Sequence, residues 1–165
     1  MQQLPADFLC RPMLLADLPT LAEFLPRVLD GNWAENHLAS QMSSHHEFLV
    51  LTKLESTSET IVGFAEFYCV LDEFHLLNFA IFEHWQRQGL ARIFLKELLR
   101  VLRARDCVQC LLEVRRSNLR AVQLYEQAGF KLVGVRPNYY SPQHEEGLRE
   151  DALLYSWSVS ESESA

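Results

Sequence analysis

The stretch QRQGLAR at residues 86–92 constrains the fold of this chain more than any other. The apolar run before it, residues 75–82, is predicted to be a strand. After Gly89, apolar side chains recur at helical spacing, at Leu90, Phe94, Leu95, Leu98, Leu99 and Leu102. A helix that begins directly after a strand points its unpaired N–H groups at one place, which suits an anion. The stretch alone leaves two interpretations open: an anion site flanked by Arg87 and Arg92, or a tight turn with solubilising arginines.

The order of the predicted elements indicates an α+β fold. Strands are predicted at residues 8–14, 47–55, 61–70, 75–82, 107–114, 130–135 and 151–159, from apolar runs bounded by turn residues. Helices are predicted to start at Asp17, within 32–42, after Gly89 and after Ser117 or Asn118, the last ending at Gly129. We therefore expect a mixed, mostly antiparallel sheet of about six to seven strands with helices on both faces.

Length and composition favour one domain inside the cell. The 165 residues are expected to form a single domain over 1–159, followed by a disordered acidic tail at 160–165. No apolar run reaches the roughly 18 residues of a membrane-spanning helix, and no secretory leader is visible, so no membrane partner is expected. The four cysteines do not require disulfides, which favours a reducing cytoplasm.

Charge is distributed unevenly along the chain. The net charge is −7, yet residues 86–120 hold nine Lys/Arg against three Asp/Glu. This stretch suits an anionic ligand, and the acidic remainder suits a cationic partner, although any single charge can simply be solvated. An acidic chain does not favour direct binding to nucleic acid.

Two side-chain patterns invite a metal or redox interpretation. Cys107-Val-Gln-Cys110 matches CxxC, but zinc needs a second pair of ligands, and the motif lies in an apolar strand-like run. We interpret both cysteines as small buried side chains. His45-His46 is interpreted as a polar connection between a helix and a strand, so no metal site is predicted.

Two known phosphate-binding loops do not fit the junction at Gly89. A P-loop needs Lys and then Ser/Thr after its second glycine, and neither follows here. A dinucleotide fingerprint needs three glycines after the first strand of a parallel unit, whereas this junction follows a meander. ATP and NAD are therefore poor candidates, and a different pyrophosphate is a better one.

Residues 86–91 resemble the Q/R-x-x-G-x-G/A signature of the GCN5-related N-acetyltransferase (GNAT) superfamily. The resemblance continues through LLEVRRSNLRAVQLYEQAGFKLVGVRPNYY and REDALLYSW, so it covers roughly residues 61–159 in matching order. It implies the GNAT fold and acetyl-coenzyme A as the cosubstrate. It also implies a pyrophosphate site at Arg87, Gln88, Gly89, Leu90, Ala91 and Arg92.

LLEVRRSN, LYEQAGF, RPNYY and REDA are most similar to the RimI-type ribosomal-protein-alanine N-acetyltransferases. This resemblance implies direct transfer of an acetyl group to the N-terminal alanine of a small-subunit ribosomal protein, a basic partner. Two alternatives stay open. One is acetylation of a small amine or another protein terminus, and the other is a non-catalytic coenzyme-binding module.

Two residues are candidates for catalysis. Glu113 ends an apolar run, where burial would raise its pKa toward that of a general base, or else it pairs with Arg115 or Arg116. Tyr125 lies on an apolar helical stripe and is either core or an acid. The resemblance assigns the base to Glu113, directly or through a water, and protonation of the thiolate to Tyr125.

The remaining candidates would hold the coenzyme and the acceptor. The resemblance implies that backbone groups of Phe79, Ala80 and Ile81 lie along the pantetheine, with an N–H of Phe79 or Ile81 binding the oxyanion. The resemblance also implies that Asn118 forms a hydrogen bond to the pantetheine. The alternative is that Asn118 caps its helix, and both roles can hold at once. Trp33, Tyr139 and Tyr140 are candidates for lining the acceptor site, with ordinary core packing as the alternative.

Overall fold

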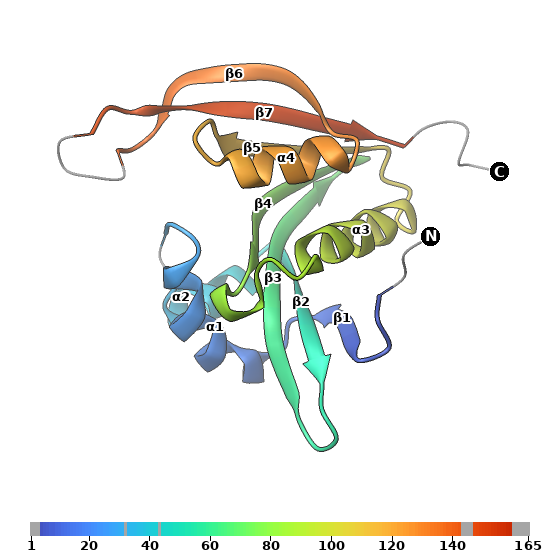
Figure 1. Ribbon diagram of the computed structural model, residues 1–165. Coiled ribbons are helices and arrows are strands. Elements are labelled where there is room, and N and C mark those ends of the chain that lie inside the picture. The colour runs from blue at the N-terminus through green and yellow to red at the C-terminus, as the bar shows by residue number, and fades with distance from the viewer. Residues whose placement is uncertain (1–3, 32, 43, 143–146, 160–165) are drawn as a thin grey trace.

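A seven-stranded sheet forms the centre of the protein (Figure 1). The structure is a computed structural model that describes residues 4–31, 33–42, 44–142 and 147–159. The strands stand in the order β1-β2-β3-β4-β5-β7-β6. Their bounds are β1 Phe8–Pro12, β2 Glu47–Leu54, β3 Glu59–Val70, β4 Glu73–Ile81, β5 Gln109–Arg115, β6 Lys131–Tyr140 and β7 Glu150–Ser158. All neighbouring pairs are antiparallel except β4 and β5, which confirms the predicted mixed sheet.

Helices cover both faces of the sheet, as the sequence predicted. Helices α1 (Leu18–Phe24) and α2 (Glu35–Met42) pack on one face, and α3 (Leu90–Arg103) and α4 (Leu119–Gln127) on the other. The alternation of β2 shows why both faces are apolar. Phe48 and Val50 point into the core under α1 and α2, whereas Leu49 and Leu51 point into the core under α3 and α4.

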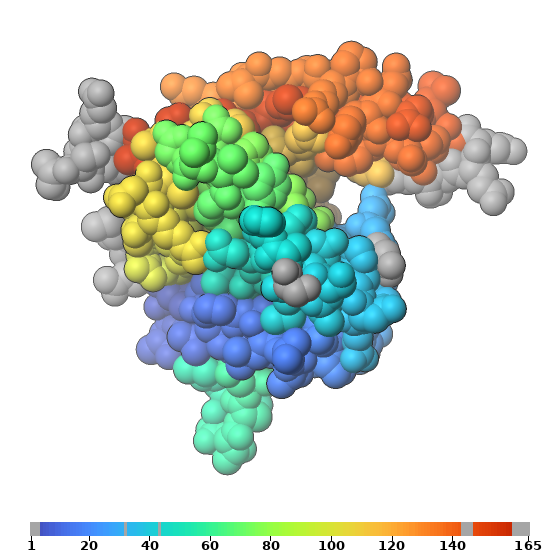
Figure 2. All heavy atoms as spheres, turned by 180° about the vertical axis from the view of Figure 1, so that it is seen from behind, coloured from blue at the N-terminus to red at the C-terminus, as the bar shows by residue number. Residues whose placement is uncertain are grey.

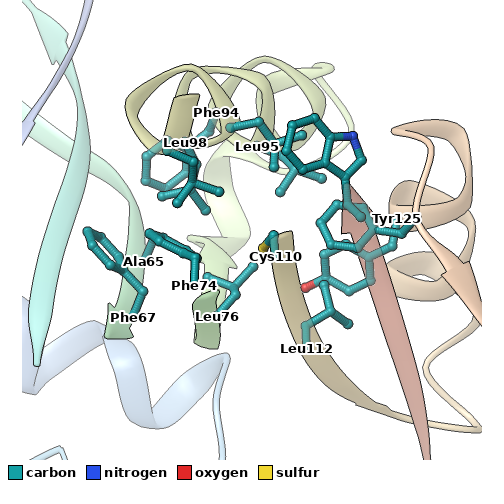
Figure 3. Packing of buried hydrophobic residues seen from close by; sticks show 14 of the residues in the cluster. Ala65, Phe67, Phe74, Leu76, Phe94, Leu95, Leu98, Cys110, Leu112 and Tyr125 are labelled. Carbon is teal, nitrogen blue, oxygen red and sulfur yellow. The ribbon is translucent and has the colours of Figure 1, made fainter. Parts of the chain in front are cut away.

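The larger core lies beneath α3 and α4 (Figure 3). All six apolar positions predicted for the α3 face are buried. Phe94 stacks on Phe79 at 5.1 Å between ring centroids, which ties α3 to β4. Burying a side chain of this size stabilises the fold by about 1.5–3 kcal/mol, so the start of α3 is held firmly against β4.

Strands β4 and β5 separate halfway along their length. Their parallel pairing extends only from Glu73↔Gln109 to Leu76↔Leu112, although both strands continue beyond it. The register with β3 shifts here, because Phe67 pairs with Leu76 and Glu66 with Asn78, which leaves Leu77 as an extra residue. Such a bulge bends a strand and increases its twist. A gap therefore opens in the middle of the sheet.

Some sequence predictions need correction at the ends of elements. Asp17 does not cap α1 through its side chain, because its carboxylate accepts from the Leu14 N–H at 2.8 Å and pairs with Arg11. The strand predicted at 130–135 continues to Tyr140 as the edge strand β6. Residues 160–165 lie outside the described part, and no helix within the described ranges is long and apolar enough to cross a membrane.

Candidate active site

A cavity of about 580 Å³ lies where the ends of β4, α3 and α4 meet. Ten of the predicted site residues line it, from three separate parts of the chain. They are Phe79, Ala80 and Ile81 of β4, Arg87, Gly89, Leu90, Ala91 and Arg92 of the junction, and Asn118 and Tyr125 of α4 and its cap. The fold thus brings together residues that are up to about 45 positions apart.

The junction at Gly89 directs the start of α3 into this cavity. Gly89 is the N-cap residue with φ +79°, a left-handed conformation that favours glycine. The Ile93 N–H donates to the Gly89 carbonyl, so the N–H groups of Leu90, Ala91 and Arg92 precede the first intrahelical bond. With Arg87, Arg92 and Arg120 lining the same space, the cavity fits a pyrophosphate.

The two glutamines of the junction have different roles. Gln88 was predicted to contact the coenzyme, but its side chain donates to the His84 carbonyl at 3.2 Å, and it is not among the described residues that line the cavity. Gln86 lines the cavity instead and donates to the Ile81 carbonyl at 2.9 Å. This bond ties the loop to the end of β4. Sequence reasoning missed it, because the bond depends on how the loop folds back.

The end of β4 presents backbone N–H groups toward the gap beside β5. The Phe82 N–H donates to the Val62 carbonyl, so it points toward β3. In an antiparallel pair the direction alternates from residue to residue, so the N–H groups of Phe79 and Ile81 point away from β3. They therefore face the side from which β5 has separated. The oxyanion role that the resemblance implies for Phe79 or Ile81 stays a prediction.

Asn118 and Tyr125 are placed by α4. The Asn118 side chain accepts from the Ala121 N–H at 3.3 Å, which confirms its predicted role as a helix cap. Tyr125 reaches from α4 toward Cys110 and Leu112 of β5 (Figure 3). Only 7% of Tyr125 is exposed, and this burial raises the pKa of its phenol well above the ordinary value. The phenol therefore keeps its proton at neutral pH and remains a donor.

Glu113 lies on the opposite face of the sheet from this cavity. Cys110, Leu112 and Val114 of β5 point into the core under α3 and α4, so Glu113 points to the face of α2. Its carboxylate pairs with Arg136 of β6 at 3.0 Å. The sequence had suggested Arg115 or Arg116 as a partner, and both of these bind other carboxylates.

Arg115 links the residues predicted for the acceptor side. Its guanidinium donates to Asp30 at 3.0 Å and to the Ser141 carbonyl at 3.1 Å, and it lies 4.4 Å from the centroid of the Tyr140 ring. Trp33, which is buried, donates its indole N–H to the Asp30 carbonyl. Arg115 thus connects the segment before α2 to the end of β6. Sequence reasoning did not assign it this role, since its partners are distant in the chain.

The two tyrosines at the end of β6 differ in burial. Tyr139 is 44% exposed and contacts Arg136 and Tyr140 through its ring. Tyr140 is half-buried, and burial, followed by the charge of Glu113, raises the pKa of its phenol to about 12. The space-filling view shows a hollow between the β6–β7 arm and the segment before α2 (Figure 2).

The fold and this cavity define an acetyltransferase. The sequence profile of the acetyltransferase (GNAT) family matches residues 16–130, and the chain belongs to this family. It is an acetyl-coenzyme A-dependent N-acetyltransferase. Within the described residues, no group of three or more His, Cys, Asp or Glu is placed to hold a metal ion.

Among its relatives is the [Ribosomal protein bS18]-alanine N-acetyltransferase of Escherichia coli K12. The two are 35% identical over 144 residues, which cover 87% of this chain and 93% of the relative. The crystal structure of the ribosomal-protein-S18-alanine N-acetyltransferase from Escherichia coli superposes with a TM-score of 0.79, covering 93% of this chain and 94% of that one. Arabidopsis thaliana NAA60 in complex with acetyl-CoA, 16% identical, shares the fold with a TM-score of 0.78 over 92% of this chain and 98% of its own.

Proposed function

We propose that this enzyme acetylates the N-terminal α-amine of a protein, with the N-terminal alanine of a small-subunit ribosomal protein as its acceptor. The name of the Escherichia coli relative supports this acceptor, because this chain matches 93% of that protein's length. A ribosomal protein is a basic partner, which suits the acidic part of this chain outside residues 86–120.

The proposed mechanism is direct transfer between two bound substrates. Acetyl-coenzyme A supplies the acetyl group as a thioester. Glu113 accepts the proton that the attacking amine loses, directly or through a water, and the N–H of Phe79 or Ile81 binds the developing oxyanion. Tyr125 donates a proton to the sulfur as the carbon–sulfur bond breaks. The acetyl group ends on the nitrogen of the acceptor.

The observation that supports this proposal is the separation of β4 from β5 beside the coenzyme cavity. The Glu113 side chain lies on one face of β5 and Tyr125 packs against the other face, and the gap between β4 and β5 connects these faces. An amine entering from the α2 face would therefore meet a thioester held on the α4 face.

The acceptor is tested with two peptides of the same sequence, both with one internal lysine. One has a free N-terminal alanine, and the other has a blocked N-terminus. Acetylation of the free α-amine alone, located by fragmentation in mass spectrometry, is the expected result. Equal modification of the lysine in the blocked peptide would refute the N-terminal acceptor.

The base is tested by Glu113→Gln, which keeps the size of the side chain and removes its charge. An α-amine has a pKa of about 7.7–8.0, so the variant should lose most activity at low pH, where neutral amine is scarce. We expect kcat/KM to fall about 100-fold near pH 7 and to recover partly above pH 8. A pH–rate profile parallel to that of the wild type would exclude Glu113 as the base.

We further propose that residues 1–159 act as a single domain in the cytoplasm. All four cysteines, Cys10, Cys69, Cys107 and Cys110, are free thiols, as is usual in a reducing compartment. Cell fractionation of the tagged full-length protein tests the location, and a single cooperative unfolding transition tests the domain.

A further inference from the structure

A hollow of about 210 Å³, smaller than the coenzyme cavity, opens on the α2 face of the sheet. Its walls come from the segment before α2, from α2 itself, and from β3 and β4. The side chains that matter for its chemistry are Asp30, Trp33, His37, Glu66 and Asn78. This hollow is separate from the coenzyme cavity, and none of the steps above uses it.

Glu66 gives this hollow its charge. It is one of the few buried charged residues, with 6% of its surface exposed. Its carboxylate accepts from Asn78 Nδ2 at 2.8 Å and contacts His46 Nδ1 at 2.6 Å. Each of these two partners contacts a different oxygen of the carboxylate, which fixes its position in the wall of the hollow. A carboxylate held in such a wall favours a cationic side chain over an anionic one.

The hollow lies beside the place where the acceptor would react. Asn78 stands two positions before Ala80 on β4, and Ala80 lines the coenzyme cavity. Asp30 pairs with Arg115, which lies two positions after Glu113 on the same face of β5. A chain whose first amine reaches Glu113 from the α2 face therefore passes close to this hollow.

We propose that the hollow binds a lysine or arginine side chain of the acceptor, within the first few residues behind its N-terminus. The inference rests on the proposed N-terminal acceptor and deepens it by naming a sequence requirement. Glu66 supplies the opposite charge, and the indole of Trp33 supplies an aromatic wall that favours a cation. Asp30 pairs with Arg115 and its side chain is largely exposed, whereas Glu66 is buried in the wall of the hollow, so Glu66 is the residue that selects. Two carboxylates in the lining disfavour an anionic side chain.

The test uses the full-length enzyme, acetyl-coenzyme A and neutral peptides that begin with alanine. A single lysine is placed at position two, three or four, and each peptide has a matched partner with glutamine at that position. We expect one position at which lysine raises kcat/KM at least tenfold over glutamine, mainly by lowering KM. Equal kcat/KM values for the lysine and glutamine peptides at all three positions would overturn the subsite and leave the N-terminal acceptor standing. If no peptide is acetylated at its α-amine, the proposed acceptor fails and the subsite with it.

Glu66→Gln tests the residue itself, because it keeps the shape of the side chain and removes its charge. We expect the preference for lysine at the responsive position to fall to about twofold or less, through a higher KM for the lysine peptide. The matched control is Glu23→Gln, an exposed carboxylate on α1 that pairs with Arg27. The control should keep the full preference. A preference that survives in Glu66→Gln would overturn the assignment, and turnover of the glutamine peptide reports whether the variant is folded.

Discussion

Tyr125 is buried as firmly as a core residue, and this burial is compatible with the acid role proposed above. It belongs to the core under α3 and α4, and it also lines the coenzyme cavity. Burial raises the pKa of its phenol, which an unperturbed tyrosine also keeps protonated at physiological pH. The two interpretations of this residue, core or acid, are therefore compatible.

Tyr125→Phe removes one hydroxyl and keeps the ring that packs against Phe130. We expect kcat to fall about 100-fold while the KM for acetyl-coenzyme A stays within about twofold, because the lost proton donor acts on the leaving thiolate. Steady-state kinetics with a thiol-detecting reagent measures both constants. Unchanged kcat would mean that the tyrosine serves packing alone.

The raised pKa of Tyr140, about 12, predicts how stability depends on pH at the alkaline end. Below about pH 10 both folded and unfolded chains hold the phenol proton. Between about pH 10 and 12 the unfolded chain loses the proton and the folded one keeps it, so the free energy of unfolding falls as pH rises. Cys10 and Cys69, whose pKa values are raised to about 11, add to this decline.

The free energy of unfolding of Tyr140→Phe should therefore fall less steeply with pH than that of the wild type above pH 10, although both proteins lose stability. Urea unfolding at intervals between pH 8 and about 11.5 measures the two slopes. The comparison between the two proteins cancels the contribution of the cysteines. Identical slopes would mean that Tyr140 is not shielded from solvent in the folded state.

At the scale of elements, the start of α3 depends on the conformation of Gly89. A Cβ added there would meet no atom within 4 Å, so a substitution is opposed by backbone strain at φ +79° rather than by a clash. Gly89→Ala should lower the free energy of unfolding by about 1 kcal/mol. It should also raise the KM for acetyl-coenzyme A severalfold, since the first N–H groups of α3 would shift.

Gly134→Ala on β6 is the matched control for Gly89→Ala. Its added Cβ would come no closer than 3.9 Å to Leu154, and it lies outside the residues that line the coenzyme cavity. We expect its KM for acetyl-coenzyme A to equal that of the wild type. If both variants bind the coenzyme equally well, the geometry of the junction does not control binding.

At the scale of the whole molecule, Arg115 connects two parts that the sheet holds apart. It joins Asp30, before α2, to Ser141 and Glu150 at the ends of the β6–β7 arm. Arg115→Ala should let the segment before α2 and the β6–β7 arm move relative to each other. We expect the KM for the peptide to rise about tenfold, equivalent to about 1.4 kcal/mol. The KM for acetyl-coenzyme A should not change, because that cavity lies on the other face.

Arg116→Ala is the control for Arg115→Ala, since Arg116 is an exposed neighbour that pairs with Asp151. An exposed pair contributes little, so its peptide KM should stay near that of the wild type. Titrating the peptide at saturating acetyl-coenzyme A separates the two variants. Equal effects would indicate that general charge, and not the link between the two sides, guides the acceptor.

Most of the fold could be predicted because its helices and strands depend on local sequence patterns. The period of α3 and the glycine at its start depend on neighbours in the chain, and both appear in the structure as expected. The ten predicted residues that line the coenzyme cavity were found because a family resemblance relates positions that no local pattern connects.

The sequence by itself determined the order of the elements and the buried face of α3, since both follow from spacing along the chain. Only the tertiary structure decided which distant charges meet. Glu113 pairs with Arg136 and not with its neighbours, Arg115 reaches Asp30, and Glu66 contacts His46. It also decided that the extra residue Leu77 accompanies the separation of β4 from β5. These contacts depend on sheet register and twist, which bring together residues that no spacing in the sequence relates.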